Sequence, residues 1–486
     1  MDIDKHVLPV SALKMEGKTL ESLLKKSSVE PDLLTIEATV ASGLESVAEG
    51  ECHEIFGEAT ETSVERGRVY FNIHRNVLRE VFHMRSIDNV YIIVYEKKCD
   101  FQFDKEEDML ILFKCYFEID WKKPISIWQE VYKYTGNVYP TKEEYNCSKR
   151  IYDAINLSNP KKCKIMREKM KASASESEDD VEKTAGVVKE VEKTQENFSQ
   201  DSNDVGEKEN VDTKKEPEVL TGDENSPAES KITIPKFRVS SKRVGVHAFS
   251  SEDVAKTYGS LIQEAFFWIV DLTEFDMEIV ANITDFDFIV SISLTKSSLH
   301  RRNLTAFGLT SLRATICYGL LKLALPKPGD IVIDPLAGSG SIPIEGAAAF
   351  SKSFVLAGDL QEAACGLIKK NVDNFDCRKK LPLDVLKWDT ANLPLRTSSI
   401  DVIVTDMPFG KRSGSKASNK VLYPNALKEF GRILRNGSGR AVLLTADRRS
   451  LELAYNQTKQ LWNVAERRLV NVGGIKALVF ILRRAL

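Results

Sequence analysis

Several features that define other protein classes are missing from this sequence of 486 residues. No apolar run approaches the ~20 residues that a membrane-spanning helix needs. The start, Met1-Asp-Ile-Asp-Lys5, lacks the basic segment and apolar core of a secretory signal. The eight cysteines include no C-x-x-C pair, so neither a disulfide framework nor a zinc site is indicated. We therefore expect a soluble cytoplasmic protein without a membrane segment or metal of its own, with a nuclear pool as the alternative.

Charge is nearly balanced over the whole chain but not along it. The net charge is −3, yet residues 172 to 230 hold 18 Asp or Glu against 6 Lys or Arg. The rest of the chain holds 53 acids against 62 bases, a net of +9. A basic folded part suits a nucleic-acid partner, although a solvated surface accounts for much of it. The acidic tract has too few apolar residues to build a core, so we expect a disordered insert over residues 165 to 230.

Hydrophobic periodicity divides the remaining chain into domains. Residues 1 to 33 show no strong pattern and are interpreted as a leader. A βαββαβ-like rhythm and then helical spacing predict an α+β domain over residues 34 to 164. A second small α+β domain is expected over 231 to 302. From 303 to 486, short β-branched strands alternate with helices, which predicts an α/β domain whose last strand is antiparallel.

A glycine-rich loop follows the first strand of the α/β domain, where residues 328 to 345 read PGDIVIDPLAGSGSIPIE. Gly338 and Gly340 let the backbone approach a ligand at the carboxyl end of that strand. A dinucleotide fingerprint is the rival interpretation, but it requires a small residue where Pro343 stands, and an Asp-Pro start is unusual for it. A Walker phosphate loop is excluded because G-x-x-x-x-G-K-[ST] does not occur.

Acidic residues stand at the ends of four successive predicted strands. Asp359 is placed to bind both hydroxyls of a ribose, and Asp389 to reach the amino group of an adenine. Each acid by itself also fits a helix cap or a solvated loop, and for Asp389 that interpretation is nearly as strong. The ordered set favours a nucleoside-containing cofactor: Asp334, Asp359, Asp389 and Asp406.

Residues 401 to 412, DVIVTDMPFGKR, form the most informative stretch of the chain. An exocyclic amine is a poor nucleophile because its lone pair is delocalised, so an enzyme must accept hydrogen bonds from it. Asp406 can supply one acceptor, and Pro408 fixes the chain so that the Met407 carbonyl can supply a second. Phe409 offers a face on which a base can stack. An Asp-x-Pro turn after a buried strand is also a common βα connection.

This set resembles the class I methyltransferases that methylate exocyclic amines through an Asp/Asn-Pro-Pro-aromatic motif, here with Met407 in place of the first proline. The resemblance implies Asp406, Met407, Pro408 and Phe409 as catalytic residues. It implies S-adenosylmethionine as the cofactor, bound by Asp334, Pro335, Gly338, Gly340, Asp359 and Asp389. The motif does not separate guanine N2 from adenine N6 or cytosine N4, nor RNA from DNA.

Basic residues cluster in the domain between residues 231 and 302, as a phosphate backbone requires. This domain resembles a THUMP domain of tRNA-modifying enzymes through Phe237-Arg238-Val239, the R-x-G-x-H-x-F-x-S string from Arg243, and His300-Arg301-Arg302. His247 equally fits a structural role. Including two residues after the catalytic loop, the RNA-binding candidates are Lys236, Arg238, Lys242, Arg243, His247, Arg301, Arg302, Lys411 and Arg412.

A THUMP domain followed by an Asp-x-Pro-Phe methyltransferase domain is a narrow combination. Over residues 34 to 160 and 232 to 486 the chain resembles the THUMP-domain tRNA guanosine N2-methyltransferases. The resemblance implies α+β ferredoxin-like and THUMP domains followed by an α/β Rossmann-like class I methyltransferase domain. It also implies that the THUMP domain binds the tRNA 3′ end, that position 6 or 7 of the acceptor stem is methylated, and that a small zinc-binding activator subunit is the partner.

Three alternatives to this function stay open from the sequence. One is an N2-guanosine methyltransferase of a spliceosomal small nuclear RNA, which shares the domain order. Another is an RNA-binding scaffold that has lost catalysis. The third is methylation of DNA or of a protein amine.

Overall fold

The computed structural model describes residues 18–158, 232–308, 310–375, 380–410 and 415–486. The described residues form a large compact unit within 18–134, 237–261 and 272–486, and a smaller one within 135–158, 232–236 and 262–271. The expected acidic insert over 165 to 230 lies outside the described residues, as do Lys411 and Arg412. Among the described helices, none is long and apolar enough to cross a membrane.

The N-terminal part alternates strands and helices as the sequence predicts. Its strands pair antiparallel in the order β2-β3-β1-β4. A 3₁₀ helix, η2, takes the place of the second expected α-helix, and the ferredoxin-like assignment stays a prediction. The elements are α1 (Leu20–Val29), β1 (Leu33–Thr39), α2 (Glu45–Phe56), β2 (Thr62–Glu65), β3 (Arg68–His74), η2 (Arg75–His83) and β4 (Asn89–Lys98).

The prediction of a leader over residues 1 to 33 is wrong for its second half, because α1 is an ordered part of the core. Thr19 caps this helix by accepting a hydrogen bond from the Ser22 N–H at 3.2 Å. Leu20 and Leu23 are buried against Tyr70 and its neighbours on the sheet. A ten-residue helix with so few apolar positions gives only a weak periodic signal.

A single sheet runs through both predicted α+β domains. β4 pairs antiparallel with β8, with Ile92 opposite Ile292, and the full order is β2-β3-β1-β4-β8-β7-β5-β6. Strands on both sides of the predicted boundary at residue 164 therefore belong to the same sheet. The remaining elements of this region are α3 (Lys105–Tyr116), α4 (Lys122–Tyr132), α5 (Lys142–Ser158), β5 (Lys236–Val244), α7 (Ser251–Phe266), β6 (Ile269–Val270), β7 (Met277–Thr284) and β8 (Asp287–Ser293).

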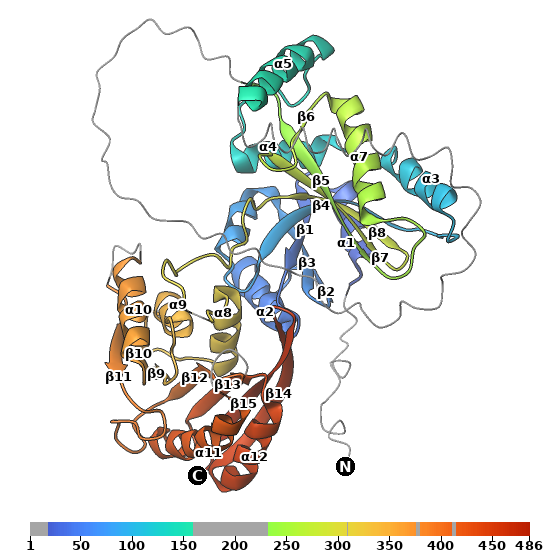
Figure 1. The fold of residues 1–486 in the computed structure, drawn as a ribbon. Helices are drawn as coiled ribbons and strands as arrows, with labels where there is room; N and C mark the ends of the chain where they lie inside the picture. Colours follow the sequence, from blue (N-terminus) through green and yellow to red (C-terminus); the bar gives the residue numbers. More distant parts are fainter. Residues whose placement is uncertain (1–17, 159–231, 309, 376–379, 411–414) are drawn as a thin grey trace, which may run out of the picture. The chain divides into compact units, whose positions relative to one another are not determined.

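The C-terminal part contains the predicted α/β sheet (Figure 1), with strand order β11-β10-β9-β12-β13-β15-β14. The first five strands are parallel, and β15 is antiparallel to both of its neighbours, as expected for the last strand. The strands are β9 (Ile331–Asp334), β10 (Phe354–Asp359), β11 (Leu383–Lys387), β12 (Val402–Asp406), β13 (Arg440–Thr445), β14 (Trp462–Val472) and β15 (Ile475–Arg484).

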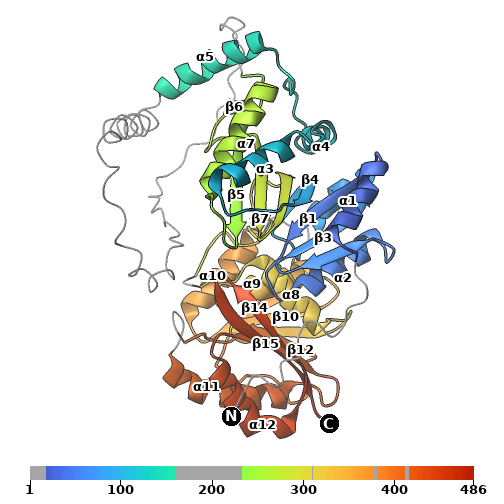
Figure 2. The same cartoon turned by 90° about the vertical axis from the view of Figure 1, so that its right-hand side faces the viewer.

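Helices cover both faces of this sheet, so its central strands are apolar throughout. Val402, Ile403 and Val404 in β12 are all fully buried. One face packs on α11 and α12, whose Tyr423, Phe430 and Leu451 join the core, and β14 with β15 makes a long hairpin (Figure 2). The helices are α8 (Ala314–Ala324), α9 (Ser341–Ala349), α10 (Glu362–Asp373), α11 (Lys416–Ile433), α12 (Arg448–Thr458) and η3 (Lys459–Leu461).

Candidate functional site

Three of the four predicted acids are the last residues of neighbouring parallel strands. Asp359 ends β10, Asp334 ends β9 and Asp406 ends β12, and these strands are adjacent in the order β10-β9-β12. Because the carboxyl ends of parallel strands meet at one edge of the sheet, the three carboxyl groups lie at that edge. This is where a sheet of this kind binds its ligands.

The glycine loop after β9 has the conformation that the sequence requires. Gly338 and Gly340 have φ of +53° and +90°, which disfavours other residues. A Cβ at position 340 would lie 3.1 Å from Ile344 and Ile368, whereas position 338 faces open space. The Gly338 N–H donates to Asp359 Oδ2 at 3.1 Å. The loop is therefore tied to the second strand end while its backbone stays open to a ligand.

Asp334 is a buried carboxyl group with one unused oxygen. Its Oδ1 accepts hydrogen bonds from Thr405 Oγ1 at 2.6 Å and from the Leu336 N–H at 3.2 Å. Its Oδ2 has no partner among the described residues. Burial and then the neighbouring Asp406 charge hold the pKa of Asp334 well above its usual range. A cationic donor such as the ammonium group of an amino acid would satisfy Oδ2 and favour the ionised form.

Asp406 and Met407 are consecutive residues, and each carries an acceptor oxygen. Asp406 is half-buried at the end of β12, and burial, assisted by the Asp359 charge, raises its pKa to about 7. Met407 is buried, and its N–H donates to the Leu444 carbonyl at 2.8 Å, which extends the β12–β13 pairing by one residue. In the described part of the chain no donor bonds to the Met407 carbonyl. An incoming amine could therefore bond to both oxygens.

The next two residues complete the loop. Phe409 is half-buried beside this pair in the sequence, and Gly410 has φ of +73°. The Pro408 carbonyl is already bonded, since it accepts hydrogen bonds from Tyr423 Oη at 2.6 Å and Asn419 Nδ2 at 2.8 Å. Pro408 thus has a partner in α11, whereas the Met407 carbonyl stays available.

Two residues that sequence reasoning missed support the loop region. Trp388 is buried, and its Nε1 donates to the Pro335 carbonyl at 3.2 Å. It also fills the space over Gly358, where a Cβ would lie 2.4 Å from the indole. Asp389 beside it is exposed, and its Oδ1 accepts from the Ala391 N–H at 2.9 Å, as a turn cap does. The only sequence signal for this supporting role was the position of Trp388, a single tryptophan at the end of a predicted strand.

Asn371 of α10 is the second missed residue. It is buried and bonds by its amide to the Ser339 and Ala306 carbonyls at 2.9 and 2.8 Å. Its Oδ1 accepts from the backbone N–H groups of Thr305 and Ala306. Asn371 therefore fixes the segment before α8 against the glycine loop. No local pattern could have indicated this, because the partners lie 32 and more residues away.

The predicted RNA-binding residues fall into two groups. Lys242 and Arg301 are exposed, and Lys236 is half-buried at the start of β5. Arg238, in contrast, bonds to Glu278 at 2.7 Å and stacks on Phe275. These contacts occupy its guanidinium, so the structure assigns Arg238 a packing role within the sheet region.

Two further candidates also have partners inside the protein. His247 Nε2 lies 2.6 Å from the Asp285 carbonyl, and its ring contacts Phe101 and Phe249. Arg243 Nη1 lies 3.3 Å from His247 Nδ1. The structural interpretation of His247 is thus the one its surroundings support.

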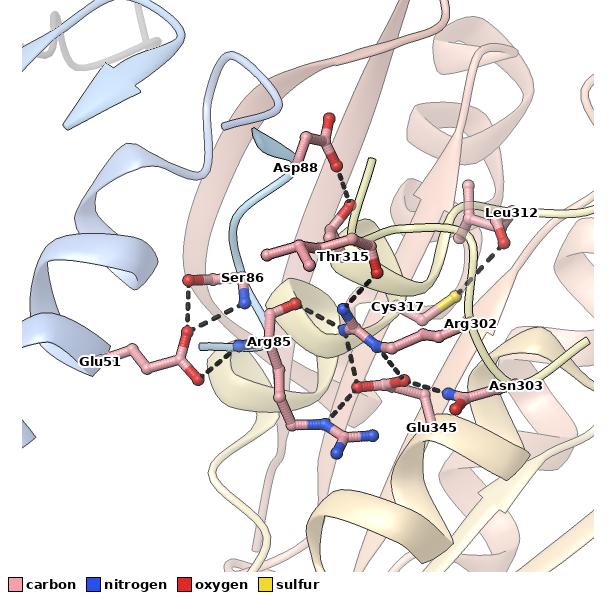
Figure 3. Close-up of polar contacts among 11 residues, drawn as sticks. Glu51, Arg85, Ser86, Asp88, Arg302, Asn303, Leu312, Thr315, Cys317 and Glu345 are labelled. Atoms are coloured by element: carbon pink, nitrogen blue, oxygen red, sulfur yellow. Dashed lines mark hydrogen bonds and ion pairs between the residues drawn. The ribbon is translucent and has the colours of Figure 1, made fainter. Parts of the chain in front are cut away.

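Arg302 was predicted to contact RNA, but in the structure it bonds to the fully buried Glu345 (Figure 3). The structure therefore corrects this prediction. The Arg302 Nε and Nη2 donate to the Glu345 carboxylate at 3.2 and 3.0 Å, and Nη2 also donates to the Arg85 carbonyl at 2.6 Å. The Arg85 Nε donates to the same carboxylate at 2.7 Å. The Asn303 amide also donates to it. A buried carboxylate with these donors is a structural ion-pair cluster.

This cluster joins the N-terminal part to the helix after the glycine loop. Glu345 lies in α9, while Arg85 precedes β4. Glu51 of α2 holds the Arg85 segment by accepting from the backbone N–H groups of Arg85 and Ser86, each at 2.9 Å. In the described residues no group of three His, Cys, Asp or Glu could hold a metal ion.

We expect Glu345→Ala to lower the free energy of unfolding by about 3 kcal/mol, because two guanidinium groups lose their buried counter-charge. Urea denaturation followed by circular dichroism measures this. Glu54→Ala is the matched control, since Glu54 forms an exposed ion pair with Lys322 at 2.6 Å between α2 and α8. That surface pair is expected to contribute less than about 1 kcal/mol. Equal losses in the two variants would contradict the role given to Glu345.

Comparison with known proteins follows the same division of the chain. Residues 216–293 match the THUMP domain family, and residues 301–477 match the family described as RMKL-like, methyltransferase domain. The tRNA (guanine(6)-N(2))-methyltransferase THUMP3 of Bos taurus is 38% identical over 94% of this chain and 90% of its own length. The U6 snRNA (guanine-N(2))-methyltransferase THUMPD2 of Homo sapiens is 30% identical over 43% and 41%.

A solved structure agrees with these matches at the level of the fold. TrmN from Thermus thermophilus aligns with a TM-score of 0.60 at 20% identity, covering 93% of this chain and 99% of its own. The orphan Asp334 oxygen, the open glycine loop and the Asp359 strand end fit S-adenosylmethionine as the cofactor. The chain is a methyltransferase in which a THUMP domain precedes the class I catalytic domain, and it belongs to the family of the THUMP3 tRNA (guanine(6)-N(2))-methyltransferases.

Proposed function

We propose that this chain methylates the N2 atom of a guanosine in the acceptor-stem region of tRNA, at position 6, with position 7 as the alternative. The observation that carries the proposal is the pair of acceptors at the end of β12, the Asp406 carboxylate and the Met407 carbonyl, which precede Phe409. The name of the THUMP3 relative, a tRNA (guanine(6)-N(2))-methyltransferase, supports tRNA guanine as the substrate. The shorter match to a U6 snRNA enzyme favours tRNA over small nuclear RNA.

The cofactor, when bound, supplies an electrophilic methyl group. In the proposal Asp334 and the glycine loop hold its amino-acid end, Asp359 binds its ribose and Asp389 lies near its adenine. The target base leaves its stack and lies against Phe409. Asp406 and the Met407 carbonyl would accept hydrogen bonds from the two N2–H groups, which localises the nitrogen lone pair for attack on the methyl group. One N2 proton would leave once the methyl group is bound to the nitrogen.

The RNA contacts are proposed for the basic residues that the structure leaves accessible. Lys242 and Arg301 are exposed, and both lie in the region from 231 to 302. We propose that the THUMP domain binds the tRNA 3′ end and so sets which nucleotide reaches Phe409. The protein would carry out this reaction in the cytoplasm.

Nucleoside mass spectrometry after reaction with separate tRNA, U6 small nuclear RNA and DNA substrates tests the proposal. N2-methylguanosine in tRNA is the expected product. N6-methyladenosine, or a product in U6 RNA or DNA alone, would overturn it. No methyl transfer to any substrate in the presence of the proposed activator subunit would favour the scaffold alternative.

A partner is the second part of the proposal, a small zinc-binding activator subunit. The β14 edge of the sheet is engaged within the chain, since the Asn471 N–H donates to the Ser42 carbonyl at 2.8 Å. The other edge strand is β11, and apolar side chains at this end are exposed: Leu386 at 39% and Phe354 at 41%. These observations support the β11 edge as the surface that the activator covers.

Leu386→Asp should abolish co-purification of the activator, because a charge would be buried in the proposed interface. Pull-down of the two co-expressed chains measures this. Leu469→Asp is the matched control, an equally exposed leucine (40%) on the β14 edge, and it should leave the complex intact. Purified chain that methylates tRNA at full rate alone would remove the need for the subunit.

Asp359→Ala should weaken S-adenosylmethionine binding roughly 10- to 100-fold, the loss expected for hydrogen bonds to a charged group. The variant removes both the proposed ribose acceptor and the anchor of the Gly338 N–H. Isothermal titration gives the affinity, with Asp384→Ala, an exposed aspartate in β11, as the control. Unchanged affinity in Asp359→Ala would contradict the cofactor assignment.

Asp406→Ala should lower kcat roughly 100-fold with little change in tRNA affinity, because it removes an acceptor that acts mainly on the transition state. The Asp406 pKa of about 7 adds a pH signature. The ionised carboxylate is the stronger acceptor, so the wild-type rate at subsaturating cofactor, which follows kcat/KM, should rise with pH through about 7, and the variant should lose this rise. Single-turnover rates between pH 5.5 and 8.5 measure both effects, and a variant with the wild-type profile would exclude Asp406.

A further inference from the structure

The loop from Asp406 to Gly410 must keep its two acceptors in a fixed direction without a proline at position 407. A proline ring would restrict the backbone there. Met407 has no such ring, but it has an N–H group, which donates to the Leu444 carbonyl at 2.8 Å. Its side chain is buried in the core formed with α11. Position 407 is therefore fixed by pairing and packing, which leaves the direction of the following peptide to other contacts.

Those contacts converge on the Pro408 carbonyl. Tyr423 Oη donates to it at 2.6 Å and Asn419 Nδ2 donates at 2.8 Å, both from α11. The two donor residues are fully buried. Gly410 also lies against Asn419, since a Cβ at position 410 would be 3.2 Å from the amide nitrogen. Helix α11 thus contacts the loop at both Pro408 and Gly410.

Both donors are themselves oriented by buried partners. Tyr423 Oη lies 2.7 Å from Thr445 Oγ1 at the end of β13, and burial raises the pKa of Tyr423, so its hydroxyl remains a donor at any working pH. Asn419 Nδ2 also donates to Asp447 Oδ2 at 3.0 Å. Two acceptors around one amide nitrogen favour this orientation of the amide, in which Asn419 Oδ1 has no partner among the described residues.

Asp447 completes the arrangement as an ionised anchor. Burial opposes its ionisation, but hydrogen bonds from Asn419 and Ser450 hold the pKa of Asp447 below its usual range. Its Oδ1 also caps α12 by accepting from the Ser450 N–H at 3.3 Å. The donors to Pro408 are therefore connected to two elements of the core, β13 and α12. In the described residues none of these groups hydrogen-bonds to a strand-end acid, and of those acids only Asp406 acts on Tyr423, through its charge.

We propose that Tyr423 and Asn419 are positioning residues for methyl transfer, which hold the Pro408 carbonyl so that Asp406 and the Met407 carbonyl face the acceptor amine. The identity of that amine rests on the function proposed above. The two residues act only through the loop, so they should change the chemical step and not the binding of either substrate.

Tyr423→Phe removes one donor and keeps the buried ring. We expect kcat for tRNA methylation to fall roughly 10-fold, the change that about 1.4 kcal/mol in the barrier produces. The affinity for S-adenosylmethionine and the binding stoichiometry in isothermal titration should stay within about twofold of wild type. Tyr455→Phe is the matched control, because in the described structure the Tyr455 hydroxyl has no hydrogen-bond partner while its ring packs on Phe480.

Asn419→Ala in the Tyr423→Phe background should lower kcat further, since the Pro408 carbonyl then lacks both donors. The proposal is overturned by a kcat of Tyr423→Phe within twofold of wild type, or by an equal fall in Tyr455→Phe. It is also overturned if cofactor affinity or stoichiometry falls together with kcat, which would indicate a purely structural role. The product nucleoside is recorded in each assay, so a wild-type product other than N2-methylguanosine refutes the proposed function and leaves the kcat comparison valid.

Discussion

The catalytic domain of this protein depends on placing several carboxyl groups together at the carboxyl ends of adjacent, buried parallel strands. Asp334, Asp359 and Asp406 end three adjacent strands, and their mutual repulsion adds to the cost of burial. Donors around these strand ends offset part of that cost: Thr405 for Asp334, and the Gly338 and Gln361 N–H groups for Asp359. Among the described residues Asp334 Oδ2 has no partner, and the Asp406 carboxylate is stabilised only by a backbone hydrogen bond. In the proposed function Asp334 binds the cofactor and Asp406 binds the acceptor amine.

Buried carboxylates also join the N-terminal part of the larger unit to its catalytic domain, but these carboxylates have hydrogen-bond donors within the protein. The Glu345 carboxylate accepts from Arg85, Arg302 and Asn303, and Asp88 accepts from Thr315 Oγ1 at 2.7 Å. A close apolar contact accompanies these bonds, because a Cβ on Gly319 would lie 2.7 Å from Leu44. The paired carboxylate of Glu345 holds its neighbouring segments in one arrangement, whereas an unpaired buried carboxyl group such as Asp334 can still bind a ligand.

Much of the catalytic domain could be predicted from the sequence because its signals are local. The β-branched strands, the Gly338 and Gly340 loop and the antiparallel last strand each follow from residue types within a few positions of one another. The same holds for Asp406 and Met407, whose neighbours along the chain already define the turn. The helix α1 was missed since ten residues with little periodicity gain their stability from the sheet beneath them.

The family, the succession of strands along the chain with their terminal acids, and the acceptor loop could be recognised from the sequence, because each depends on contiguous residues. The roles of the basic and polar side chains became clear only in the folded structure. Arg302 and Arg301 are neighbours of the same type, yet one binds a carboxylate 43 residues further along the chain and the other is exposed. Tyr423 and Asn371 likewise gain their roles from partners that folding brings to them, since hydrogen bonding depends on distance in space and not on separation in sequence.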